Sequence, residues 1–127
     1  MADHDDDQAE MMEALAHGIS LAYTILVDVC ANLPVPIGMP TERQVTAVEA
    51  LPAIRRAAEL ASDQPMSELQ EARLFTGCIH LLAAVDLYRL CLGQYEETRA
   101  HGVGINLTHA EEALKDLARW LMTIQPD

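Results

Sequence analysis

The chain has 127 residues and carries 20 Asp and Glu against 8 Lys and Arg, so its formal net charge is −12 at pH 7. This length fits one domain, and this charge disfavours nucleic acids and anionic membrane surfaces as partners, because affinity for both comes from clustered Lys and Arg. Only 4% of the residues are aromatic, which favours helix over sheet.

The first seven residues, MADHDDD, predict a flexible acidic tail, and residues 8–127 predict a single helical domain. The acidic start lacks the positive residues and apolar core of a secretory signal. The three cysteines fit no metal-binding spacing and fall inside apolar helical stretches. We therefore expect a cytoplasmic protein whose thiols are free and buried.

The first helix is expected over residues 7–32. Its apolar residues alternate in steps of three and four, which predicts packing against a second long helix at a shallow angle. They are Met12, Leu15, Ile19, Ala22, Leu26, Val29 and Leu33. A polar line at the same spacing includes His17, Thr24 and Asp28, and it either faces solvent or lines a pocket.

Three prolines, at positions 34, 36 and 40, end this helix. The sequence from Thr41 to Gln44 predicts a capping box at the start of the second helix, which we expect to end by residues 62–65. Pro52 lies inside its apolar pattern, so a kink is expected just before it.

The third helix is expected to begin at the capping box Ser67–Gln70 and to run without a break to residue 101, with Gly102 as its C-cap. A break at Gly93 is the alternative. The helix contains residues 74–92, which are apolar nearly all round, as in helices buried inside a bundle or in a subunit interface. Asp86 and Arg89 are spaced to form an ion pair within this run.

Residues 102–107 predict a short loop, and Thr108 begins a third capping box that opens the fourth helix. The elements together predict an all-α fold, an up-and-down four-helix bundle with long helices 1 and 3. The third helix would be longer than its neighbours, so part of its apolar surface would not be covered by the other helices. We therefore expect a homodimer, because two-fold dimers are the commonest oligomers.

No pattern for catalysis or metal binding is found. Glu-x-x-His and His-Glu-x-x-His are both absent, and Cys78 and His80 are two residues apart, so they point to different sides of a helix. We therefore expect no catalytic residues, no metal and no cofactor, and a protein that is not an enzyme.

The leading hypothesis is a non-enzymatic interaction or regulatory protein that acts as a homodimer or with a protein partner. The second is a bundle that binds a small-molecule effector in a polar-lined core pocket. The pocket candidates are His17, Thr24, Asp28, His80, Asp86, Tyr88 and Arg89.

The third hypothesis is an acidic inhibitor that mimics nucleic acid. The mixing of acidic residues with Arg counts against this hypothesis. One feature separates the first two hypotheses. An interaction protein needs an external apolar patch, whereas a ligand binder needs an internal cavity with polar walls.

Overall fold

The computed structural model describes residues 2–41 and 47–124, and every regular element in these ranges is helical. The α-helices are α1 (Ala2–Ala31), α2 (Ala47–Leu60), α3 (Glu68–Gly93) and α4 (Glu97–Ile124). A short 3₁₀-helix, η1 (Ala61–Asp63), follows α2. The prediction of an all-α protein with four packed helices is confirmed.

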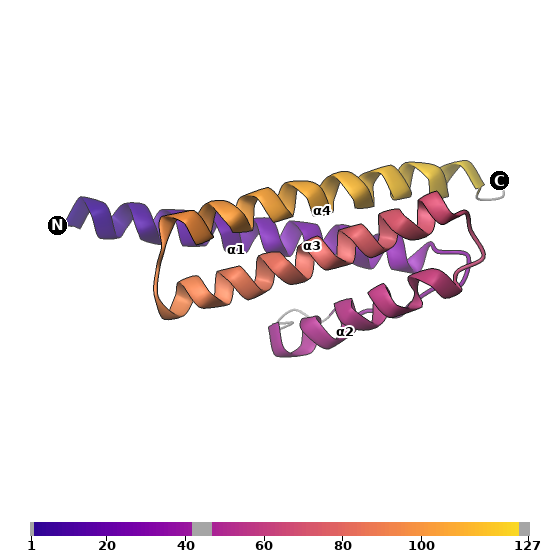
Figure 1. Ribbon diagram of the computed structural model, residues 1–127, viewed down its shortest axis with the longest axis horizontal. Coiled ribbons are helices and arrows are strands. Elements are labelled where there is room, and N and C mark those ends of the chain that lie inside the picture. Colours follow the sequence, from indigo (N-terminus) through magenta and orange to yellow (C-terminus); the bar gives the residue numbers. More distant parts are fainter. Residues whose placement is uncertain (1, 42–46, 125–127) are drawn as a thin grey trace.

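The central element is α3, which packs against each of the other helices. In Figure 1 α4 and α2 lie on either side of α3, and α1 packs on α4 and α3. One continuous core of Leu, Ile, Val, Ala and Cys side chains joins all of them. The most apolar helix of the sequence is therefore the helix with the most neighbours.

The apolar seam of α4 explains how it packs. Its buried residues are spaced in alternating steps of three and four, which keeps them on one side of an α-helix. They are Ala100, Val103, Leu107, Ala110, Leu114, Leu117 and Leu121. Ion pairs such as Lys115–Glu111 and Arg119–Asp116 lie on the solvent side of the same helix.

Small residues let α4 approach its neighbours closely. A Cβ built at Gly77 of α3 would lie 2.6 Å from two atoms of Leu114, Cγ and Cδ2. Two turns earlier on the same side of α4, Leu107 reaches Gly18 of α1, where an added Cβ would lie 2.9 Å from Leu107 Cδ1. Leu107 and Leu114 therefore occupy space that any larger residue at these glycines would fill.

The connection between α1 and α2 runs back along the bundle. Ile37 donates its N–H to Cys30 O at 3.0 Å, and the hydroxyl of Tyr23 donates to Pro40 O at 2.8 Å. The chain thus reaches the level of Tyr23 again before α2 begins. As a result α1, α2 and α4 run in one direction in Figure 1, and α3 runs in the other.

This direction of α2 is a correction to the predicted up-and-down order, which holds for α3 and α4 but not for α2 after α1. Prolines at positions 34, 36 and 40 keep the connection from becoming helical. Leu33 and Ile37 of the connection are buried in the core, so the segment lies along the bundle instead of turning tightly at its end.

Gln64 holds the start of this connection. Its Oε1 accepts a hydrogen bond from Val35 N at 2.9 Å, and its Nε2 donates to Val35 O at 2.7 Å. The side chain is buried, so both of its polar groups need partners. This paired contact joins the segment after α1 to the segment after η1.

The expected continuous third helix is wrong, and its alternative, a break at Gly93, is confirmed. The helix α3 ends at Gly93 and α4 begins at Glu97. The expected loop at 102–107 is helical instead, because Val103 and Leu107 continue the buried seam of α4. Thr108 is therefore no N-cap, and its hydroxyl donates to Gly104 O within the helix.

Three of the predicted helix starts can be compared with the structure. The N-cap at Ser67 is confirmed, since Ser67 Oγ accepts from Gln70 N. The return hydrogen bond of a capping box is not found among the described residues, and Gln70 Oε1 accepts from Arg73 instead. The first helix begins at Ala2, earlier than the expected residue 7. The predicted capping box Thr41–Gln44 falls mostly outside the described residues.

Candidate functional site

The polar line on α1 lies at the surface. His17, Thr24 and Asp28 are all exposed, and the Thr24 hydroxyl donates back to Ser20 O at 2.9 Å. These residues do not line a cavity with the candidates on α3. They form the solvated side of α1, which was one of the two alternatives for this line.

Asp86 and Arg89 of α3 are both exposed, and the expected ion pair between them is not formed. Tyr88 lies between them in sequence but points elsewhere, half-buried against the core. Asp86 and Arg89 lie on the side of α3 that no other helix covers, so water solvates the two charges separately. Arg89 has no carboxylate partner in the described part of the chain.

The interior has few polar groups. Among the described residues, only Gln64 and Gln70 are buried polar side chains, and neither belongs to the predicted pocket. Every buried side-chain nitrogen and oxygen in this part has a hydrogen-bond partner. The described core is therefore apolar.

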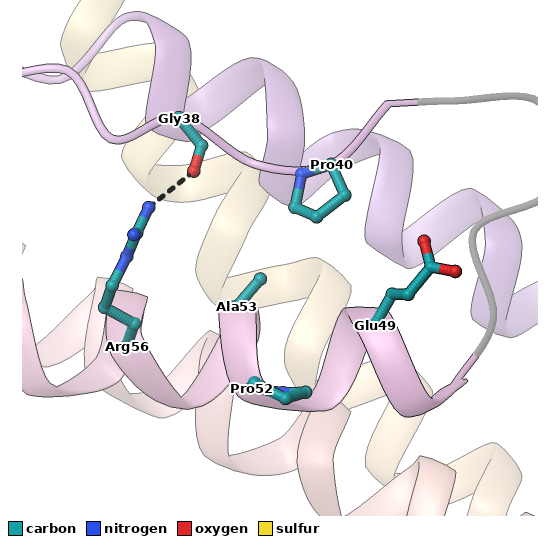
Figure 2. Close-up of a pocket in the computed structure, with 6 residues that line it drawn as sticks. All are labelled: Gly38, Pro40, Glu49, Pro52, Ala53 and Arg56. Atoms are coloured by element: carbon teal, nitrogen blue, oxygen red, sulfur yellow. Dashed lines mark hydrogen bonds between the residues drawn. The ribbon is translucent and has the colours of Figure 1, made fainter.

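A depression lies between α2 and the segment that leads back to it (Figure 2). Its volume is about 460 Å³, and it is wide open to solvent. The guanidinium of Arg56 crosses it and donates to Gly38 O at 2.8 Å. Glu49, Pro40 and Pro52 complete the walls. The donor that spans this depression is already used to hold the connection against α2.

Two histidines meet at the junction of α3 and α4. The rings of His80 and His109 have centroids 5.1 Å apart and planes inclined by 30°. His80 Nδ1 lies 2.8 Å from Asn106 Oδ1, and Asn106 Nδ2 donates to Gly102 O at 2.9 Å. His80 is half-buried, and His109 is exposed. We call these three residues the histidine cluster.

The uncovered side of α3 carries a line of apolar side chains, which we call the outer stripe. It consists of Ala72, Phe75, Ile79, Ala83 and Leu90. These residues are spaced by three, four, four and seven, and Asp86 occupies the place between the last two. Phe75 is 50% exposed, Ile79 41% and Leu90 54%, which is unusual for such large apolar residues on one helix side.

Sequence reasoning missed part of these two features. The expected loop at 102–107 separated Asn106 from His109, although they are three residues apart and share one side of a continuous helix. For the outer stripe, the spacing of Phe75, Ile79 and Leu90 was present in the sequence. The exposure of that side could be known only once the other helices were placed.

The cysteines are not available as nucleophiles. Cys30, Cys78 and Cys91 are free and buried. Burial raises the pKa of Cys30 to about 12, although Arg56 acts in the opposite direction. Burial also raises the pKa of Cys78 strongly. The thiolate is the reactive form, and burial suppresses it at these two positions.

The raised thiol pKa values predict alkaline destabilisation. An ordinary thiol here has a pKa of 9.0, so above this pH the unfolded chain loses the protons that Cys30 and Cys78 keep when folded. The unfolded state then binds fewer protons, and the free energy of unfolding falls as pH rises. Each thiol contributes a slope of about 1.4 kcal/mol per pH unit, between pH 9.0 and about 12 for Cys30.

Urea denaturation at pH 8, 9, 10 and 11 measures this slope. Cys30→Ala and Cys78→Ala should each make it shallower, whereas an exposed substitution such as Gln94→Ala should leave it unchanged. Equal slopes in all four proteins would contradict the assignment to the buried thiols.

Comparison with protein-family models, with curated proteins and with solved structures finds no match for this chain. Two helical segments within the described residues, Asp6–Ala31 and Glu68–Gly93, are long and apolar enough to cross a membrane by length and composition alone. Buried core helices of water-soluble bundles have the same property, and both segments contribute to the core.

Proposed function

We propose that the protein is a non-enzymatic, cytoplasmic interaction protein that acts as a homodimer through the outer stripe of α3. The observation that carries this proposal is the exposure of Phe75, Ile79 and Leu90 on one side of the central helix. Exposed apolar side chains at helical spacing are typical of a surface that a second helix covers.

Charge supports a second copy of the chain as the occupant. Glu68 and Glu71 lie in the first turn of α3, and the unpaired Arg89 lies near its other end. In a dimer whose two-fold axis is perpendicular to α3, the two α3 helices run antiparallel, and each contact occurs twice. If Ile79 lies near the two-fold axis, Arg89 of one copy falls opposite Glu68 and Glu71 of the other.

Side-chain size supports the same register. Phe75 lies four residues before Ile79 and Ala83 four residues after it, so the largest residue of the outer stripe faces one of the smallest across the two-fold axis. Asp86 falls opposite Ala72 in the same way, where the small side chain of Ala72 leaves room for it. This alternation of large and small residues lets two apolar helix surfaces interdigitate.

The cytoplasmic assignment rests on the cysteines. All three are free and enclosed in the apolar core, as is usual for proteins kept in a reducing compartment.

Analytical ultracentrifugation over a concentration series tests the homodimer. We expect Ile79→Asp to weaken association by about 100-fold or more, because the substitution places a charge at the centre of the interface. Leu21→Asp is the matched control, since Leu21 is similarly exposed but lies on α1. It should leave association unchanged, and circular dichroism should show both variants folded.

A charge exchange tests the register. Arg89→Glu should weaken the dimer by several-fold, and adding Glu68→Arg and Glu71→Arg to the same chain should restore it. A wild-type chain that stays monomeric at tens of micromolar would contradict the proposal. A dimer that Ile79→Asp leaves intact would also contradict it, because the contact would then lie elsewhere.

A further inference from the structure

The histidine cluster holds two imidazoles from different helices on one side of the molecule. His80 comes from α3 and His109 from α4, and their ring centroids are 5.1 Å apart. His80 directly follows Ile79, so it lies about 100° around α3 from the centre of the outer stripe. The cluster is therefore a feature separate from the proposed dimer surface.

Asn106 fixes which nitrogen of His80 carries the proton. Its Nδ2 donates to Gly102 O at 2.9 Å, which directs its Oδ1 toward the ring. Because Oδ1 can only accept, His80 Nδ1 must be the donor in the 2.8 Å contact. In the neutral ring, the lone pair then lies on Nε2. Histidines that bind transition metals through one ring nitrogen are commonly oriented in this way. A second residue accepts a hydrogen bond from the ring nitrogen that does not bind the metal.

The separation of the rings suits one shared ion. Two imidazoles on a tetrahedral ion, with metal–nitrogen bonds of about 2.1 Å, have ring centroids roughly 5 Å apart. The observed separation is 5.1 Å. Imidazole nitrogen is a preferred ligand for Zn²⁺, Ni²⁺ and Cu²⁺, and a net charge of −12 attracts cations to the chain.

We infer that His80 and His109 form a binding site for a divalent transition-metal ion of the Zn²⁺ class, which joins α3 to α4. No group of three or more His, Cys, Asp or Glu ligands is found in the described residues, so water completes the coordination. Such a site is open and exchanges its ion, unlike a closed four-ligand structural site. The ion binds the folded chain and thereby stabilises it.

Isothermal titration with Zn²⁺ tests the site, with all proteins carrying His4→Ala so that the acidic start of the chain adds no histidine ligand. We expect one ion per chain with micromolar affinity. His80→Ala and His109→Ala should each lose at least tenfold in affinity, and Asn106→Ala should lose less, because it acts through His80. His17→Ala and His101→Ala, on exposed surfaces of α1 and α4, are the matched controls and should bind as the parent does.

Two further measurements complete the test. Circular dichroism without metal should show all variants folded, and Zn²⁺ should raise the melting temperature only where both cluster histidines remain. Co²⁺ should give the visible absorption of a tetrahedral or five-coordinate site in the parent and not in His80→Ala. Equal Zn²⁺ affinity in the parent, His80→Ala and His109→Ala would overturn the inference, as would an equal loss in His101→Ala.

Discussion

Leu114→Ala is expected to lower the free energy of unfolding by about 2–5 kcal/mol, the range for removing a fully enclosed leucine side chain. Leu114 is 0% exposed and lies on α4 directly above Gly77 of α3. Because Gly77 has no side chain, nothing on that side can move in to fill the space. The loss should therefore fall in the upper part of the range.

Urea denaturation followed by circular dichroism measures this loss. Met122→Ala is the control, because Met122 lies on the same helix but is 78% exposed, and it should change stability by no more than about 0.5 kcal/mol. Equal effects at the two positions would contradict the packing described for the junction of α3 and α4.

Gly77→Ala and Gly104→Ala are expected to act in opposite directions, although both replace a helical glycine. Ala is favoured over Gly by up to about 1 kcal/mol within a helix. At Gly104 nothing lies within 4 Å of the added methyl, so that gain should appear as increased stability. At Gly77 the methyl would lie 2.6 Å from Leu114 Cγ and Cδ2. Either the Leu114 side chain or the helices must shift there, at a cost of about 1–3 kcal/mol.

The two positions should also be coupled. In a Leu114→Ala background the obstacle to a methyl at Gly77 is gone, and the methyl occupies part of the vacated space. Gly77→Ala should then be nearly neutral or stabilising, and the double-mutant cycle should show a coupling above about 1 kcal/mol. Additive effects would indicate that Gly77 and Leu114 do not determine the distance between α3 and α4.

The sequence predicted the helices well where an apolar seam was uninterrupted. The steps from Ala110 to Leu121 placed the second half of α4 correctly, and Ser67 marked the start of α3. Glycines caused the errors. Gly77 lies inside α3, Gly93 ends it, and Gly102 and Gly104 lie inside α4. Local preference is the same for all of them. Gly102 and Gly104 are helical because Val103 and Leu107 continue the buried seam of α4 through them.

The selection of candidate site residues depended on the predicted helix boundaries. His80 was selected from the sequence, but its partners Asn106 and His109 were assigned to a loop and to a cap, so the histidine cluster could not be assembled. The direction of α2 was equally hidden. It depends on the contacts of Tyr23 with Pro40 and of Gln64 with Val35, which join distant positions through one and two hydrogen bonds, respectively, and leave no periodic signal.

The packing of α1 on α4 also affects how the chain can fold during synthesis. The helix α1 is made before α2, α3 and α4 but lies against α4, and Gly18 of α1 meets Leu107 of α4. At about 5–20 residues per second, α1 leaves the ribosome several seconds before α4 exists. The α3–α4 hairpin is local and should close quickly, whereas α1 must wait with its apolar seam uncovered. This part of the nascent chain is therefore most prone to aggregation before α4 appears, and a chaperone that covers apolar helices would act in that interval.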